Sequence, residues 1–80
     1  MSREEVYTVL NEIFCDVFDD ESLVVDATTT AADIEDWDSL EHINLVVAIE
    51  KKFQIKFNMG EVNTFKNVGD MVEIIMTKIG

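Results

Sequence analysis

The chain has 80 residues, 48% of them apolar, with 17 acidic and six basic side chains and a formal net charge of −11 at pH 7. This length predicts a single domain, residues 1–80, and no apolar run approaches the ~20 residues of a membrane span. The negative charge disfavours binding to nucleic acid or anionic lipid and favours partners with basic docking surfaces. Because the sequence starts with an acidic amphipathic segment and not with a signal-peptide pattern, we expect a cytoplasmic protein.

The first predicted element is a helix over residues 3–18. Ser2 and Glu5 have the spacing of a capping box, which marks a helix start. An apolar stripe then repeats at three and four residues: Val6, Val9, Leu10, Ile13 and Val17. Cys15 falls opposite this stripe on a helical wheel, so we expect an exposed and inert thiol. The single histidine, His42, lies on a different predicted element, which argues against a Cys15 nucleophile.

Residues 19–37 show no sustained periodicity and are predicted to form a long loop. Its apolar residues are expected to attach it to the core: Leu23, Val24, Val25 and Ile34. Loops of this length are uncommon in small domains and are often functional. Its acidic residues lack the spacing of a calcium-binding loop, and His42 has no suitable second ligand, so we expect no dedicated metal site.

A second helix is predicted from Asp38, as N-cap, to about Phe53, with Glu41 supporting its start. One wide arc of its wheel is apolar: Leu40, Ile43, Val46, Val47, Ile49 and Phe53. The narrower face left to solvent contains Ala48 and Asn44.

Two further elements complete the predicted fold. A segment around residues 60–64 is long enough for only a turn or so of helix, and a last helix begins after Asn67. The last helix has an apolar stripe: Val68, Met71, Val72, Ile75 and Ile79. The fold class predicted from these elements is all-α, a small antiparallel bundle of three long helices and one short third helix.

Ser39 is the residue with the clearest chemical meaning. It lies at the predicted start of the second helix, where free N–H groups and the helix dipole favour an esterified phosphate. Residues 1–50 hold 14 of the 17 acidic side chains, so Ser39 lies within the acidic part of the chain. The pattern contains no base paired with this serine, which suggests a substrate of other enzymes and not an enzyme.

The segment from Asp36 to Phe57 resembles the acyl carrier protein family, whose modified serine lies in an Asp-Ser-Leu motif and carries 4'-phosphopantetheine. The matching positions are Asp38, Ser39, Leu40, Ile43, Leu45, Val46, Ala48, Ile49, Glu50 and Phe53. That family is also a four-helix bundle with a long first loop and a short third helix. The resemblance therefore covers nearly the whole chain.

The resemblance implies a discrete carrier of acyl thioesters, in fatty acid or related acyl-chain biosynthesis, with phosphopantetheine from coenzyme A attached to Ser39. A phosphopantetheinyl transferase would recognise Asp38 and Leu40, and Glu35, Asp36 and Glu41 would dock the basic surfaces of acyl-transfer and chain-modifying enzymes. A sequestered acyl chain would enter between the second and third helices, near Val46, Ile49, Phe57, Val62 and Phe65. The protein is expected to be a monomer.

Several positions depart from the fatty-acid members of the family. Trp37 replaces a small residue and is expected to anchor the loop by packing, Asn44, Lys51 and Lys52 replace acidic residues, and Asn58 replaces a common proline. These changes leave the attachment site intact and leave the pathway open. An aminoacyl or peptidyl carrier of a secondary-metabolite pathway is one alternative, and an acidic helical interaction module without any prosthetic group is another.

Overall fold

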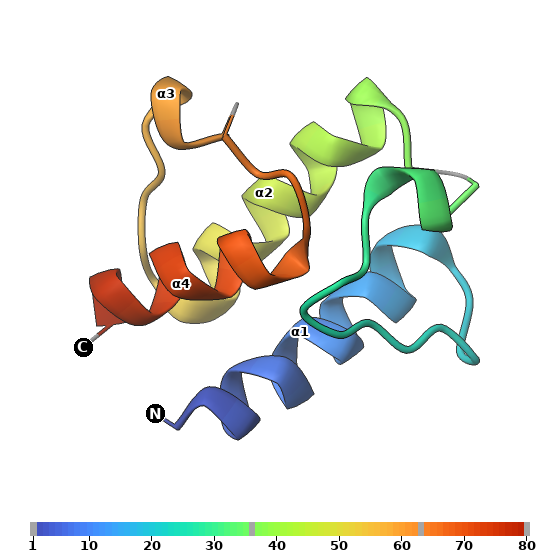
Figure 1. The fold of residues 1–80 in the computed structure, drawn as a ribbon, viewed down its shortest axis with the longest axis horizontal. Helices are drawn as coiled ribbons and strands as arrows, with labels where there is room; N and C mark the ends of the chain where they lie inside the picture. The colour runs from blue at the N-terminus through green and yellow to red at the C-terminus, as the bar shows by residue number, and fades with distance from the viewer. Residues whose placement is uncertain (1, 36, 63, 80) are drawn as a thin grey trace.

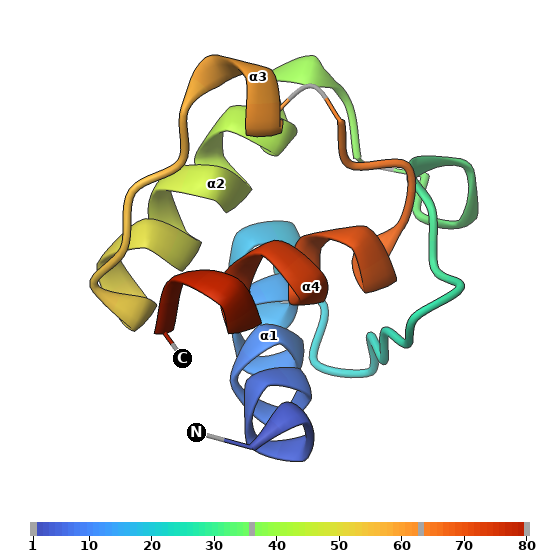
Figure 2. The same cartoon turned by 60° about the vertical axis from the view of Figure 1, so that its left-hand side comes forward.

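The computed structural model describes residues 2–35, 37–62 and 64–79. They form four α-helices, α1 (Arg3–Phe18), α2 (Ser39–Phe53), α3 (Met59–Val62) and α4 (Val68–Ile79), and one turn of 3-10 helix, Ala31–Asp33. In Figures 1 and 2, α2 runs back against the direction of α1, and α4 crosses α1. No strand occurs in these ranges, so the predicted all-α bundle is confirmed.

The helix boundaries follow from local capping. Ser2 and Glu5 form the predicted capping box of α1, with Glu5 N–H donating to Ser2 Oγ over 3.2 Å. At the start of α4, the Asp70 N–H donates to Asn67 Oδ1 over 2.8 Å. α1 ends where Asp19 adopts a left-handed conformation, with φ of 51°, and α2 ends similarly at Gln54. Both long helices therefore end where the sequence predicted.

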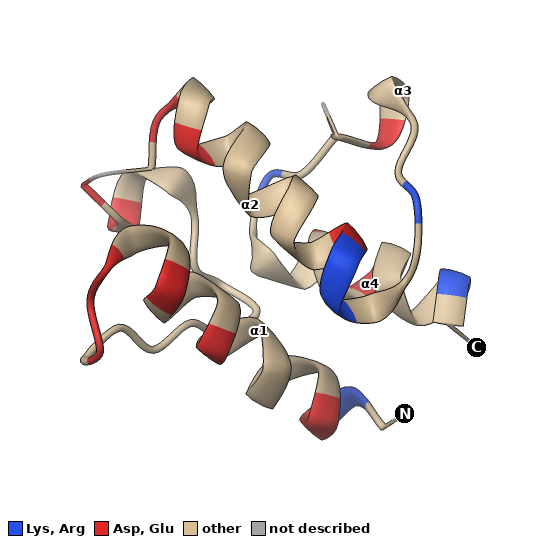
Figure 3. Cartoon of the chain, turned by 180° about the vertical axis from the view of Figure 1, so that it is seen from behind, with Lys and Arg blue, Asp and Glu red and all other residues tan. Residues whose placement is uncertain are grey.

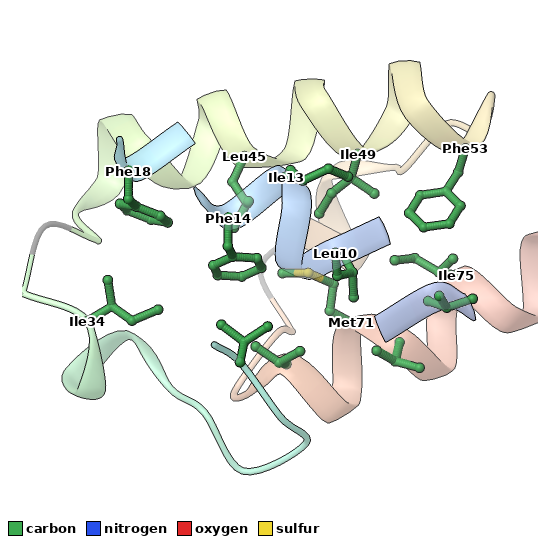
Figure 4. Packing of buried hydrophobic residues seen from close by; sticks show 14 residues of the cluster. Leu10, Ile13, Phe14, Phe18, Ile34, Leu45, Ile49, Phe53, Met71 and Ile75 are labelled. Atoms are coloured by element: carbon green, nitrogen blue, oxygen red, sulfur yellow. The ribbon is translucent and has the colours of Figure 1, made fainter. Parts of the chain in front are cut away.

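The core lies where α1 contacts α2 and α4, and Figure 4 shows its side chains meeting there. On α1, the fully buried large side chains include Phe14 and Leu10, and Phe18 is also buried. The predicted stripe of α1 was wrong in part, because Val9 and Val17 are only half-buried and Phe14 was missing from it. α4 matches its prediction at Val68, Met71, Val72 and Ile75, which are all fully buried, whereas Ile79 is only half-buried.

The predicted apolar face of α2 is also partly wrong. Leu40, Ile43 and Val47 are exposed by 66%, 58% and 41%, and Leu45 is fully buried instead. The neighbouring helices cover only one side of α2, since α3 is just four residues long. An apolar arc on a helical wheel is thus wider than the strip that neighbours cover.

The long loop is fastened to α1 by polar side chains. Val25 N–H donates to Asn11 Oδ1 over 2.7 Å, and the Cys15 thiol donates to Leu23 O over 3.3 Å. Cys15 is therefore half-buried against the loop, which corrects the expectation of an exposed thiol. Of the expected anchors, Val25 and Ile34 are buried, whereas Val24 is 79% exposed.

The same loop also caps α4. Val68 N–H donates to Thr29 O over 2.8 Å, and Gly69 N–H donates to Ala27 O over 3.0 Å. Hydrogen bonds from the Thr28 hydroxyl and the Thr28 N–H hold the pKa of the Asp26 carboxyl below its ordinary value. These bonds shape the turn that presents the two carbonyl groups to α4.

Gly69→Ala is expected to destabilise the fold, although alanine favours helix over glycine by about 1 kcal/mol. A Cβ at residue 69 would lie 2.9 Å from Ala27 O, the atom that accepts the Gly69 N–H. The carbonyl cannot move away without losing that bond, so we expect a net loss of about 1 kcal/mol in urea unfolding. Gly60→Ala is the control, because its Cβ would meet only the Asn58 side chain, at 3.3 Å. Equal stabilisation by both substitutions would contradict this account.

Acidic side chains are concentrated in the first half of the chain, and α3 and α4 carry a few more. Figure 3 shows Asp and Glu along α1, the loop and the start of α2, and Lys at the far ends of α2 and α4. Arg3 pairs with Glu73, which joins the start of α1 to α4. Within the described residues, no helix is both long and apolar enough to cross a membrane.

Candidate functional site

Ser39 is the first residue of α2 and its side chain is exposed. The preceding Asp38 is the N-cap, since its carboxylate accepts the Glu41 N–H over 2.8 Å and its carbonyl accepts the His42 N–H over 2.9 Å. These two bonds hold the first turn of α2 in place. The Ser39 hydroxyl consequently lies at the positive end of a 15-residue helix, where a phosphate ester is favoured.

A cavity of about 380 Å³ lies beside this serine. It is lined by residues of the loop, of the first turn of α2 and of the connection to α4: Ala31, Trp37, Asp38, Ser39, His42, Phe65 and Lys66. The Trp37 and Phe65 rings provide apolar walls, and Lys66 provides a positive charge. The residues thus fit a phosphodiester on Ser39, followed by a chain that has both apolar and polar groups.

His42 connects three elements around this cavity. Trp37 Nε1–H donates to His42 Nδ1 over 3.0 Å, and His42 Nε2 lies 3.3 Å from Val62 O at the end of α3. The Trp37 ring also contacts Phe14 and Phe18, with ring centroids 5.3 and 6.2 Å away, so its expected packing role is confirmed. The sequence pattern offered no signal for the histidine contact, because it joins residues from a loop and two helices.

The residues predicted for an acyl pocket come from α2, from α3 and from the segments before and after α3. Ile49 is fully buried and Val46 is buried, both on α2. The Phe57 and Phe65 rings contact each other with centroids 5.5 Å apart, and Phe65 in turn contacts the His42 ring. Val62 is half-buried and reaches His42 through its carbonyl group. Of the five, Phe65 lines the cavity beside Ser39.

The predicted docking residues lie near the start of α2. Glu35 is exposed in the turn before the helix, and Glu41 is half-exposed and accepts a bond from Asn44 Nδ2 over 3.2 Å. Asp36 lies outside the described residues. The exposed side chain of Leu40 follows Ser39 directly, and Ile43 and Val47 continue this apolar strip along α2.

α3 is held in place by charged and polar contacts. Bonds from Asn58 N–H and from Lys78, which lies 3.0 Å away, keep the pKa of the Glu61 carboxyl below its ordinary value. Across residues 2–35, 37–62 and 64–79, no three His, Cys, Asp or Glu side chains are grouped so as to hold a metal ion.

Comparison with known proteins agrees with this geometry. A family described as "phosphopantetheine attachment site" matches residues 8–75. The acyl carrier protein of Acidothermus cellulolyticus is 37% identical over 75 residues, covering 94% of this chain and 89% of the relative. The acyl carrier protein of Thermotoga maritima is 31% identical over 80 residues, covering 99% of this chain and 98% of the relative.

The solution structure of the holo acyl carrier protein of Geobacter metallireducens superposes with a TM-score of 0.86. It is 45% identical in sequence, and the alignment covers 91% of this chain and 84% of that one. The same family is indicated by the helical bundle, by the serine at the start of α2 and by these relatives. The chain belongs to the acyl carrier protein family and carries acyl groups on a covalently attached 4'-phosphopantetheine.

Proposed function

We propose that Ser39 is the residue to which phosphopantetheine is attached. The observation that carries this proposal is the exposed Ser39 hydroxyl at the first position of α2, beside the 380 Å³ cavity. The helix end and Lys66 favour the negative charge of a phosphodiester there. The group, when bound, supplies the thiol that forms thioesters with acyl cargo.

The chain's own residues prepare this serine for modification by another enzyme. Asp38 keeps the first turn of α2 formed by accepting the Glu41 N–H, so that the Ser39 hydroxyl is held at the helix end. The exposed Leu40 side chain offers an apolar contact to a phosphopantetheinyl transferase. We propose that the transferase supplies the base that takes the hydroxyl proton, and that this domain acts as substrate and carrier in a cytoplasmic pathway.

Intact-mass measurement tests this proposal. The protein is incubated with a phosphopantetheinyl transferase and coenzyme A, and we expect a mass gain of one phosphopantetheine per chain. Peptide fragmentation should then place the added mass on Ser39. A protein that gains no mass with an active transferase, or that gains it on Ser2 or Ser22, would contradict the proposal.

The acidic surface around Ser39 supports docking of basic partners, namely the transferase and acyl-transfer or chain-modifying enzymes. Fatty acid or related acyl-chain synthesis is the pathway we propose. Aminoacyl or peptidyl transfer is the second candidate, since the same serine chemistry serves it and since Lys51 and Lys52 depart from the acidic pattern of fatty-acid carriers. To distinguish the two candidates, the holo protein is incubated with an acyl synthetase and its acyl substrate and, separately, with an aminoacyl synthetase and its amino acid. The candidate pathway is the one whose substrate is loaded.

Glu41→Lys is expected to slow loading of Ser39 about two- to fivefold at low ionic strength. This factor corresponds to the free energy that one exposed ion pair contributes to binding. The substitution reverses the charge two residues after Ser39, and the slower rate should also depend less on salt because a steering charge is lost. Initial rates at low and at physiological salt provide the measurement. Glu12→Lys makes the same change in net charge on α1 and should load like the wild type. Equal rates for all three proteins would exclude Glu41 from the docking surface.

We also propose that a sequestered acyl chain lies between α2 and α3, near Val46, Ile49, Phe57, Val62 and Phe65. The contact between the Phe57 and Phe65 rings is expected to open for the chain, since both rings pack at the margin of the core. Proton NMR spectra of octanoyl and holo protein should differ in the signals of these two rings. Differences restricted to α1 would contradict this location.

A further inference from the structure

His42 is the chain's only histidine, and Trp37 is its only tryptophan. Trp37 lies just before the Asp38 cap, and its ring stacks on the His42 ring with centroids 5.9 Å apart. The His42 ring also contacts Phe65, with centroids 6.0 Å apart. A continuous series of ring contacts therefore runs from Phe14 in the core, through Trp37 and His42, to Phe65 beside α3.

The hydrogen bonds of His42 require one particular protonation state. An indole N–H can only donate, so His42 Nδ1 must be the unprotonated nitrogen that accepts it. A carbonyl group can only accept, so Nε2 must carry the proton that is directed to Val62 O. The neutral Nε2–H tautomer is the one state that satisfies both contacts. A second proton on Nδ1 would face the indole N–H as one donor against another.

The charged groups around His42 are of both signs. Asp38, the N-cap of α2, and Lys66, on the connection to α4, line the same cavity as the imidazole. Glu61, next to Val62 on α3, is paired with Lys78. The imidazole therefore faces one carboxylate, that of Asp38, and one ammonium group, that of Lys66. The charge of Glu61 is already balanced by Lys78. The loss of Nδ1 as an acceptor is consequently the main effect of protonation on the Trp37 contact.

We propose that His42 is a positioning residue for Ser39. In its neutral Nε2–H tautomer, His42 holds Trp37 and the end of α3 against the first turn of α2, and protonation of His42 releases Trp37. This inference rests on the proposed function, because it concerns how Ser39 is presented for loading. The contact spans Ser39 on both sides, from residue 37 to residue 42. Its loss leaves the residues on both sides of the serine less firmly held, without removing any residue that is modified.

NMR spectroscopy of the unmodified protein tests the contact without any variant. We expect long-range proton–nitrogen correlations at about pH 7.5 to show the imidazole proton on Nε2. As the sample is acidified until the imidazole signals show protonation, the single indole N–H signal should shift together with them. A proton found on Nδ1, or an indole signal that stays constant while the imidazole titrates, would overturn the proposal.

A competition experiment tests the effect on Ser39. Wild-type protein and His42→Phe are mixed in equal amounts with one transferase and coenzyme A, and intact mass resolves the two products. The ratio of their initial rates is independent of the transferase's own pH profile. The phenyl ring preserves stacking but removes both hydrogen bonds, so we expect the wild type to load about fivefold faster at about pH 7.5. At a pH where the NMR signals show His42 to be protonated, the ratio should be smaller, because protonated His42 keeps the bond to Val62 O and has lost only the bond from Trp37.

Trp37→Phe is the second variant, since it keeps a ring against Phe14 and removes only the N–H donor. It should show the same pH-dependent ratio, and the double variant should load no more slowly than His42→Phe alone. A ratio that is constant with pH, or additive effects in the double variant, would overturn the proposal. If no protein is loaded on Ser39, the proposed function fails, and the NMR titration still decides the His42 contact independently.

Discussion

Ser39→Ala is expected to abolish loading with phosphopantetheine completely, because it removes the oxygen to which the phosphate would be bonded. The fold should remain intact, since the side chain is exposed and the cap of α2 is made by Asp38. Alanine is also favourable within a helix, so unfolding free energy should change by no more than about 0.5 kcal/mol. Intact mass after exhaustive reaction and the circular dichroism spectrum provide the two measurements.

Two other serines provide matched controls for this result. Ser22→Ala removes an exposed hydroxyl that donates to Asp20 Oδ1 over 2.6 Å in the loop, and loading should be unchanged. Ser2→Ala removes the N-cap of α1 and should cost about 1 kcal/mol of stability, again without loss of loading. Any mass gain in Ser39→Ala would show that the attachment residue has been misidentified.

Phe14→Ala is expected to cause the largest loss of stability, about 3–5 kcal/mol in urea unfolding. The side chain is fully buried, and its ring lies against Phe18 and Trp37, with centroids 5.8 and 5.3 Å away. Small domains have a total stability of about 5–15 kcal/mol, so the variant should be close to unfolding. The substitution also removes the Phe14 ring that packs against Trp37. The fluorescence of this single tryptophan should therefore change under native conditions.

Val24→Ala is the control for that prediction. Val24 is an apolar residue of the long loop after α1, but it is 79% exposed, and its truncation should cost no more than about 0.5 kcal/mol. Phe14→Leu, which fills most of the space, should fall between the two. A loss below about 1 kcal/mol in Phe14→Ala would mean that the ring is not part of the core.

The sequence alone determined the features that depend on neighbouring residues. Ser2 with Glu5, Asp38 and Asn67 each satisfy N–H groups of the helix that follows them, so the starts of α1, α2 and α4 were predictable. The position of Ser39 at a helix start follows from the same local signals, as does its suitability for a phosphate ester. Periodicity also predicted the apolar stripe of α4, which neighbours cover along nearly its whole length.

Only the tertiary structure decided which parts of an apolar arc are covered and what the long loop contacts. Phe14 is buried and Leu40 is exposed because α1 faces two helices, whereas the short α3 leaves much of α2 open. The loop carbonyls that cap α4, and the His42 bonds to Trp37 and Val62, join residues with no fixed sequence spacing. Such contacts form only when packing closes the chain on itself, so no local periodicity or capping pattern records them.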